Sequence, residues 1–412
     1  MTELLDRPIG RLRGIGATGP FYRTWWFRVI VVFLASRVVT TILLLILASV
    51  QGMNPWTAAH PGYFDFATIW DGRWYEIVSL VGYPSHLPVD VHGAVQQNAW
   101  AFLPAYPYLV NAVVFVTRLP WSAAAVLISA AFGLGASLIF YRLLRRTMDA
   151  STSLFAVVLF CTGPASPLFQ LAYAESMYMF LLVLALDLLV TRRYLLLLPV
   201  IAVMAFTRPS GLAFALLMGL HVVYRWFARK RDPFPARERI QAVGVTLYSL
   251  LAGFAWSGIA ALVTGNLQAY TDTELSWRTP YIGATKLTPF SSWIEGAHWW
   301  FVVWLGLPAW LGYATLAVVV ALFASVLFLP PVKRLGVDVR LWLASYGAYV
   351  LAVFFPQSST FRILMPMFPL AGAIAQPKSR VYRVVVVAVF IAAQLGWLLI
   401  CWGIDGADWT PP

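Results

Sequence analysis

Carboxylates are scarce in this chain, and one of them stands between a tryptophan and a glycine. The segment FATIWDGRWYEIVSLVGYP, residues 66–84, follows the first long apolar run and places Asp71 at the start of a helical apolar pattern. Arg73 can pair with Glu76 at i+3, so Asp71 has no obvious local partner. Such a carboxylate can act as a general base that takes a proton from an attacking hydroxyl. An N-cap is the alternative, and the pattern alone leaves both open.

Two arginines interrupt apolar runs in a way that favours an anionic ligand. Arg208 lies in the segment TRPSG, and Arg362 lies in the segment FRILMP. An arginine at bilayer depth costs about 3 kcal/mol on insertion scales, so it needs an anionic partner or a water-filled cavity. Pro209 and Gly211 break the helix and free backbone N–H groups, which together with a guanidinium would suit a phosphate. Snorkelling to the lipid headgroups is the alternative for both arginines.

Two more carboxylates could support Asp71. Glu175 opens an apolar run in the segment AYAES, where an unpaired carboxylate is expensive. A favourable interaction with the helix dipole is the simpler explanation of that position. Asp65 could orient Asp71 or a ligand hydroxyl, or it could only form a turn.

The elements that must hold these residues are membrane helices. Of the 412 residues 60% are hydrophobic and 11% charged, with a mean hydropathy of +0.75. Such a composition, with recurrent apolar runs of about 18 residues or more, predicts one polytopic all-α membrane domain over residues 1–412. Cys161 and Cys401 both lie in apolar runs, which predicts buried thiols. We predict about eleven transmembrane helices: 29–50, 121–141, 151–166, 173–190, 195–207, 211–224, 242–264, 299–328, 341–355, 361–376 and 384–402.

The basic residues predict the orientation. Most of the 29 Lys and Arg residues fall in the N-terminal tail and in every second loop, which the positive-inside rule assigns to the cytoplasm. The net charge of +12 is therefore a topology signal and predicts no nucleic-acid partner. This assignment requires the segment 102–117 to lie at the surface instead of spanning. The first outer loop, 51–120, then carries Asp71, and a second outer loop covers 265–298.

Several other kinds of site lack a signature. There is no Walker loop, Rossmann glycine pattern, HExxH or paired CxxC, and the five histidines show no ligand spacing. We therefore predict no metal site and no required cofactor, although a divalent metal bridging Asp71 and Asp65 is compatible with the sequence.

Taken in order, five short motifs resemble one family. They are Trp70-Asp71, Tyr83-Pro84, the segment FLPAYP at 102–107, the segment AYAES at 172–176 and the segment TRPSG at 207–211. This combination is similar to the PIG-V-type mannosyltransferases of glycosylphosphatidylinositol synthesis and their bacterial relatives, in the GT-C glycosyltransferase superfamily. The similarity covers about residues 37–211 well. The tail 405–412 looks similar to actinobacterial members, which implies a bacterial plasma membrane.

The resemblance implies a membrane glycosyltransferase, with the site outside, that moves a sugar from a polyprenyl-phosphate donor to a lipid or cell-envelope glycan acceptor. Mannose is the expected sugar and inversion the expected stereochemistry. Asp71 maps onto the catalytic base, helped by Asp65 and Glu175. The candidates for the donor phosphate are Arg208, Arg362, Lys286 and Arg278. Candidates for stacking on sugar or acceptor are Tyr75, Trp70, Tyr106 and Trp277.

Two alternatives from other classes stay open. One is a GT-C transferase for another sugar, such as arabinose. The other is a lipid or sugar transporter or flippase, for which internal repeats and ionisable residues deep in the spans would be expected. The chain shows no such repeat, and ten of its 17 carboxylates and four of its five histidines map to the outer loops instead of the middle of the spans.

Overall fold

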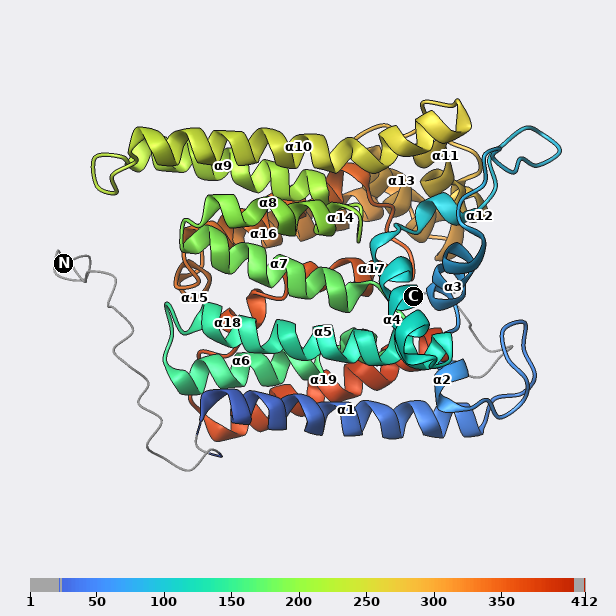
Figure 1. Cartoon of the computed structure of the whole chain (residues 1–412), viewed down its shortest axis with the longest axis horizontal. Helices are drawn as coiled ribbons and strands as arrows, with labels where there is room; N and C mark the ends of the chain where they lie inside the picture. The colour runs from blue at the N-terminus through green and yellow to red at the C-terminus, as the bar shows by residue number, and fades with distance from the viewer. Residues whose placement is uncertain (1–21, 23, 404–410, 412) are drawn as a thin grey trace.

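Helices make up nearly all of the secondary structure in the computed structural model, which describes residues 22, 24–403 and 411 (Figure 1). Most of the basic N-terminal tail and most of the segment 405–412 lie outside these residues. Within the described part, the one β feature is an isolated antiparallel bridge between Val89 and Val95.

The α-helices are α1 (Trp25–Ser49), α2 (Tyr63–Phe66), α3 (Asp71–Val81), α4 (Ala105–Thr117), α5 (Trp121–Leu144), α6 (Ala150–Thr162), α7 (Glu175–Val190), α8 (Tyr194–Ala205), α9 (Gly211–Ala228), α10 (Ala236–Thr264), α11 (Ala269–Ser276), α12 (Thr279–Ile282), α13 (Ser291–His298), α14 (Ala309–Val326), α15 (Pro330–Lys333), α16 (Val337–Val353), α17 (Thr360–Ile363), α18 (Leu370–Ile374) and α19 (Arg380–Trp402).

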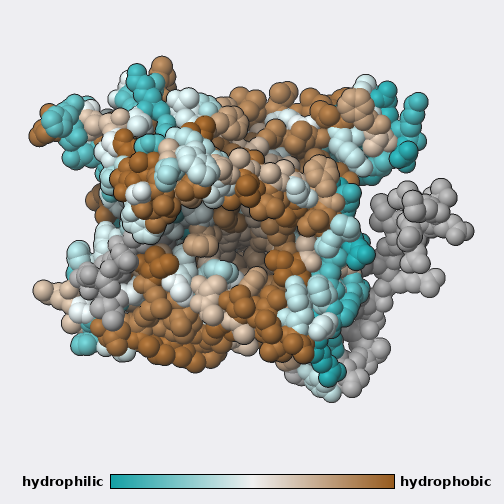
Figure 2. Space-filling view, turned by 180° about the vertical axis from the view of Figure 1, so that it is seen from behind, coloured by the Kyte–Doolittle hydropathy of each residue, from teal (hydrophilic) through white to brown (hydrophobic). Residues whose placement is uncertain are grey.

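Six of these helices are long and apolar enough to cross a membrane: α1, α5, α9, α10, α14 and α19. The chain is therefore a multi-pass integral membrane protein. Figure 2 shows the matching surface, a broad apolar band between two hydrophilic ends. The predicted spans 151–166, 173–190, 195–207 and 341–355 correspond to the shorter helices α6, α7, α8 and α16, which have 12 to 17 residues. Both cysteines are buried free thiols, as predicted.

Two predicted spans are not continuous helices. The segment 299–328 begins as a π-helical turn, Trp299–Trp304, and α14 starts only after Pro308. The segment 361–376 consists of α17, a 3-10 turn at Met365–Met367 and α18. Proline has no N–H to continue an α-helix, and Pro366 and Pro369 fall where this segment breaks. Apolar composition predicted the two segments, but their prolines shorten the helices.

The segment 102–117 lies at one end of the bundle, beside α3 (Figure 1). Its helix α4 has 13 residues, about 20 Å at 1.5 Å per residue, whereas the hydrocarbon core is about 30 Å thick. The Asn111 side chain donates a hydrogen bond to the carbonyl of Ser79, at 2.5 Å, and so ties α4 to α3.

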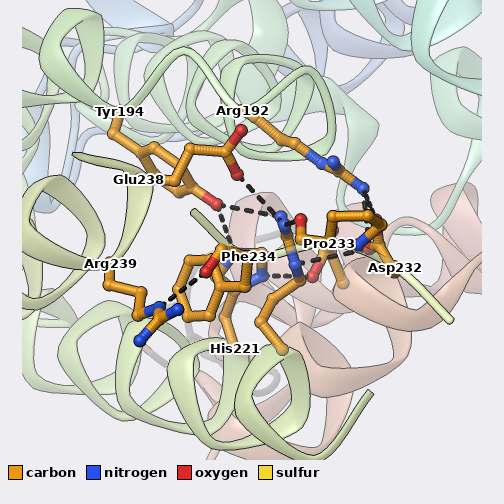
Figure 3. A network of polar contacts seen from close by, with 10 residues as sticks. Arg192, Tyr194, His221, Asp232, Pro233, Phe234, Glu238 and Arg239 are labelled. Atoms are coloured by element: carbon orange, nitrogen blue, oxygen red, sulfur yellow. Dashed lines mark hydrogen bonds and ion pairs between the residues drawn. The ribbon is translucent and has the colours of Figure 1, made fainter. Parts of the chain in front are cut away.

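The opposite end of the bundle gathers the basic turns. The turns that join α5 to α6, α7 to α8 and α9 to α10 all lie there (Figure 1). A network of polar contacts connects the α7–α8 turn with the α9–α10 turn (Figure 3). Asp232 accepts from Arg192 at 2.5 Å and lies 3.3 Å from Arg225, which also pairs with Glu238 at 3.0 Å. The buried His221 bonds to Asp338 at the start of α16, at 2.6 Å. This network fastens α9, α10 and α16 together.

Inside the bundle, the buried Arg37 of α1 is bonded to backbone groups. Its guanidinium donates to the carbonyls of Cys161 and Ser166, both at 2.7 Å. These carbonyls belong to the end of α6 and to the 3-10 turn that follows it. Helix ends leave carbonyl groups without partners, and the guanidinium satisfies two of them while its face packs on Phe33 and Phe169.

Candidate active site

Asp71 begins α3, but it does not cap it. The preceding residue, Trp70, occupies the N-cap position with φ of 61° and makes no side-chain capping bond there. Its indole N–H donates to the carbonyl of Cys401 at 2.8 Å, which fixes Trp70 against the end of α19. A positive φ is uncommon for a bulky residue and turns the chain sharply before Asp71. Asp71 is therefore the first residue of the helix and not its N-cap.

Close packing brings Asp71 to the start of α7. A Cβ at Gly72 would lie 3.3 Å from the Cβ of Ala172, so a larger residue would push the two segments apart. The N–H of Ala172 donates to the carbonyl of Ala67 at 3.0 Å, and the N–H of Asp71 donates to the hydroxyl of Tyr173 at 3.3 Å. The Trp70-Asp71 motif and the AYAES segment at 172–176 therefore lie side by side.

Two arginines join the carboxylates into one cluster. Arg362 of α17 donates a short hydrogen bond from Nη1 to Oδ2 of Asp71, and the same Nη1 lies 3.4 Å from Oε1 of Glu175. Nη1 of Arg208 lies 3.2 Å from the same oxygen of Glu175. Four residues from α3, α7, α17 and the turn before α9 therefore form an alternating chain of two negative and two positive charges.

The cluster is largely removed from solvent. The side chain of Asp71 is 13% exposed and that of Glu175 only 5%. Burial raises the pKa of the Asp71 carboxyl, and the nearby Glu175 adds to this, whereas the guanidinium groups of Arg362 and Arg208 oppose it. The two oxygens of Glu175 and Nε of Arg362 have no hydrogen-bond partner among the described residues, so the cluster keeps unused capacity for a polar ligand.

Arg208 is held by the turn that its motif forms. The carbonyl of Pro209 accepts from the hydroxyl of Tyr349, on α16, at 2.6 Å. A Cβ at Gly211 would lie 3.0 Å from the Cα of Gly253, so the glycine lets α9 start directly against α10. The turn is therefore fixed between α10 and α16, and the guanidinium of Arg208 is held beside Glu175.

A cavity of about 510 Å³ opens onto this cluster, within the usual range for small-molecule sites. Its wall has three parts. The charged part includes Asp71, Glu175, Arg208, Arg362, Glu274 and Arg278; the aromatic part includes Trp56, Trp70, Trp74, Phe102 and Trp277; the apolar part includes Val350, Val353, Phe355, Ile363 and Met365. Such a wall suits a ligand that is anionic at one point, apolar along one side and able to stack on rings.

Some predicted site residues are not brought to this cavity. Asp65, on α2, and Lys286, in the second outer loop, are exposed and line no part of it. Tyr106 is fully buried, and its hydroxyl bonds to the carbonyl of Ala125 and to Ser129. Tyr75 is buried as well and is not among the residues that line the cavity.

Arg278 does line the cavity, but its guanidinium is occupied. It donates to the hydroxyl of Ser292 at 2.7 Å and, through a short bond, to the carbonyl of Val353. These contacts join the second outer loop to the end of α16. Trp70 and Trp277 line the cavity as expected of stacking residues.

Glu274 is the main cavity residue to which the sequence assigned no function. It lies on α11, one turn before Trp277, and faces the cavity. Burial raises the pKa of its carboxyl, and a hydrogen bond with Tyr270 opposes the shift. In the sequence, its only distinguishing feature was that it precedes Trp277 by three residues in the second outer loop. The segment that forms α11 is short and polar, so this spacing did not stand out.

Among the described residues, no three His, Cys, Asp or Glu side chains are grouped to hold a metal ion. No protein-family model matches this chain, and no curated protein is significantly similar to it in sequence.

Proposed function

We propose that the protein is a membrane glycosyltransferase that moves a sugar, mannose in the first instance, from a polyprenyl-phosphate donor to an acceptor hydroxyl. The observation that carries this proposal is the position of Asp71 beside two guanidinium groups in a cavity that also has aromatic and apolar walls. A carboxylate base, an anion site and a lipid-compatible surface are the three parts that such a transfer needs.

The charges of the cluster fit the proposed displacement. The acceptor oxygen forms a bond to the anomeric carbon while the bond from that carbon to the phosphate oxygen breaks, which inverts the configuration. The acceptor proton goes to Asp71, and the donor phosphodiester, a monoanion, leaves as a lipid phosphate monoester with up to one more negative charge. Arg208 and Arg362 stabilise this added charge, so the leaving group needs no proton and the reaction needs no cofactor.

The proposal also explains how a paired carboxylate becomes a base. Arg362 now donates to Asp71, and a donor phosphate would offer the same guanidinium a competing set of oxygens. Arg208, which Glu175 holds in place at 3.2 Å, would be the second guanidinium to bind that phosphate. Binding of the donor would thus free Asp71 at the moment when the base is required.

The remaining walls of the cavity fit the other parts of the donor. Ile363 and Met365, beside Arg362, together with Val350 of α16, form an apolar surface on which the first isoprene units can lie. The aromatic side chains provide faces for sugar rings. A ligand that joins a prenyl chain, a phosphate and a sugar in this order would contact all three surfaces.

The proposed architecture follows from the same motifs. We take the fold as GT-C-type with eleven crossings, with its site on the outer face and its basic turns in the cytoplasm, and the protein as a PIG-V-like enzyme of a bacterial plasma membrane. Ion pairs at the end of the bundle opposite the cavity support this orientation, because they gather the basic turns on one side.

The test uses purified protein in lipid nanodiscs and a panel of polyprenyl-phospho-sugars, including mannose and arabinose donors. We expect release of lipid phosphate from the mannose donor when cell-envelope lipids or glycans are added. The donor preference identifies the sugar. A cooperative thermal unfolding transition shows that the purified protein is folded. If such protein consumes no donor, the proposed function is wrong.

A further inference from the structure

A second hollow in the surface, here called the α19 groove, lies between α6 and the start of α19, where the bundle gathers its basic turns (Figure 1). It has a volume of about 440 Å³ and is lined by Phe155 of α6 and by Arg383, Val384, Val387, Ala388 and Ile391 of α19. The last four residues are spaced i, i+3, i+4 and i+7, so they form one apolar stripe along the helix. From residue 383 to residue 391 the groove extends about 12 Å, at 1.5 Å per residue.

Arg383 stands at the head of the α19 groove, and three contacts hold its guanidinium there. Its Nε donates to the carbonyl of Pro377 at 3.2 Å, and its Nη1 donates to the hydroxyl of Ser151 at 3.0 Å. Its face packs on the ring of Phe155, 4.7 Å from the ring centre. The remaining nitrogen, Nη2, has no hydrogen-bond partner among the described residues. A guanidinium N–H without an acceptor is costly, so Arg383 keeps one donor for a ligand.

The charge at the head of the α19 groove is positive. Arg380 precedes Arg383 by three residues on α19, so both lie on the same helix face. Neither arginine takes part in an ion pair among the described residues. The neighbouring acid, Asp149 at the N-cap of α6, already accepts from Lys378 at 2.6 Å. This end of the groove therefore favours an anion over a group that carries its own ammonium.

We infer that the α19 groove binds an anionic phospholipid of the leaflet next to the basic turns, with its phosphate on Arg383 and one acyl chain along the apolar stripe. A phosphate oxygen supplies the acceptor that Nη2 lacks, and the acyl chain covers the four apolar side chains. Basic pockets between transmembrane helices bind anionic lipid headgroups through these two kinds of contact. Inorganic phosphate would meet the cation alone, and a zwitterionic lipid would bring an ammonium group beside Arg380.

The groove lies at the end of the bundle opposite the proposed active site, and its test needs no sugar donor. A lipid that contacts both α6 and α19 binds the folded protein only, so it should raise the melting temperature in detergent. The measurable signs of the site are thus a lipid preference and a lipid-dependent stability.

The first arm of the test measures the preference for the headgroup. Protein purified in detergent is titrated with phosphatidylglycerol and with phosphatidylethanolamine of the same acyl chains, and native mass spectrometry counts the bound lipids. We expect tighter binding of phosphatidylglycerol, and a loss of about tenfold in its affinity in Arg383→Gln, because one charge-assisted hydrogen bond is removed. Arg334→Gln, exposed at the same end of the bundle, is the matched control. Equal affinity for the two lipids, or equal losses in the two variants, overturns the inference.

The second arm fills the groove and leaves its cation in place. Ala388→Phe puts a large side chain into the groove, whereas Val389→Phe adds the same side chain at an exposed position of α19 outside the lining. We expect phosphatidylglycerol to raise the melting temperature of wild type and Val389→Phe but not of Ala388→Phe, and inorganic phosphate to raise none of them. Because Arg383 keeps its bonds in Ala388→Phe, this arm decides the question even if Arg383→Gln does not fold. Equal stabilisation of both phenylalanine variants, or an equal effect of inorganic phosphate, overturns the inference.

Discussion

Arg362 donates a hydrogen bond to Asp71 although 291 residues separate them in the chain. Each would be costly alone at this depth, because a buried charge without a partner loses its hydration. Together with Glu175 and Arg208 they form a neutral set in which each arginine contacts a carboxylate. The site is thus stable without a ligand and still presents charges that can be exchanged for those of a substrate.

Asp71→Asn tests the proposed base. We expect normal insertion and purification, because an asparagine amide has the size of the carboxylate and can still accept from Arg362. Sugar transfer should fall by about 10²–10⁴-fold, the usual contribution of general base catalysis. Release of lipid phosphate measures the rate, and Asp65→Asn, exposed on α2, is the control. Turnover like that of wild type in Asp71→Asn would exclude Asp71 as the base.

Arg362→Gln tests the charge balance of the site through pH. Asp71 must be ionised to accept a proton, so activity is lost as pH falls through its pKa. Burial already raises the pKa of Asp71, and the Arg362 guanidinium opposes this shift. Its removal should move the acid limb of the kcat/KM profile to higher pH and lower kcat/KM at the optimum by about 10²–10³-fold. An acid limb that stays in place, measured from pH 4 to 9, would mean that Arg362 does not act on the base.

Gly253→Leu tests the packing that fixes Arg208. A Cβ at Gly253 would lie 3.1 Å from the N of Leu212 and 2.8 Å from its side chain, so a leucine must separate α9 from α10. We expect a cost of about 1–3 kcal/mol, seen as a lower melting temperature in detergent, together with weaker donor binding. Gly258→Leu is the matched control on the same helix, because nothing lies within 4 Å of its Cβ position. Equal effects of both substitutions would contradict this account.

Arg37→Met tests a buried cation that has no acidic partner among the described residues. The substitution keeps most of the apolar volume but leaves the carbonyls of Ser166 and Cys161 without their donor. We expect a loss of about 1–3 kcal/mol for each carbonyl, measured by thermal unfolding. Arg334→Met, at an exposed site, should change the melting temperature little. Unchanged stability of Arg37→Met would show that these bonds are not needed.

The sequence predicted the helical membrane architecture and the carboxylates and arginines of the cluster. The length of an apolar run predicts a membrane span, and the basic loops predict its orientation; both are properties of single segments. A lone charged residue in an apolar run indicates that it has a partner, because an unpaired charge there is costly. The sequence could not identify the partner, because Asp71, Glu175, Arg208 and Arg362 come from four separate elements. It also could not separate aromatic residues of the wall from those behind it, so Tyr75 and Tyr106 were grouped with Trp277.

Breaks in helices were the other weak point. The segment 361–376 reads as one apolar span, and hydropathy does not register that Pro366 and Pro369 divide it. Arg362 depends on this division, since α17 has four residues and ends before the first proline. A continuous helix would extend along the bundle instead of presenting its first turn to Asp71.

The distance along the chain between Asp71 and Arg362 also sets the order of biosynthesis. A ribosome that adds about 5–20 residues per second needs about 15–60 s to pass from one residue to the other. During this interval the nascent protein holds a carboxylate whose counter-ion has not been translated. No product truncated before α17 can contain all four charged residues of the cluster, so the cluster can form only after α17 has been translated.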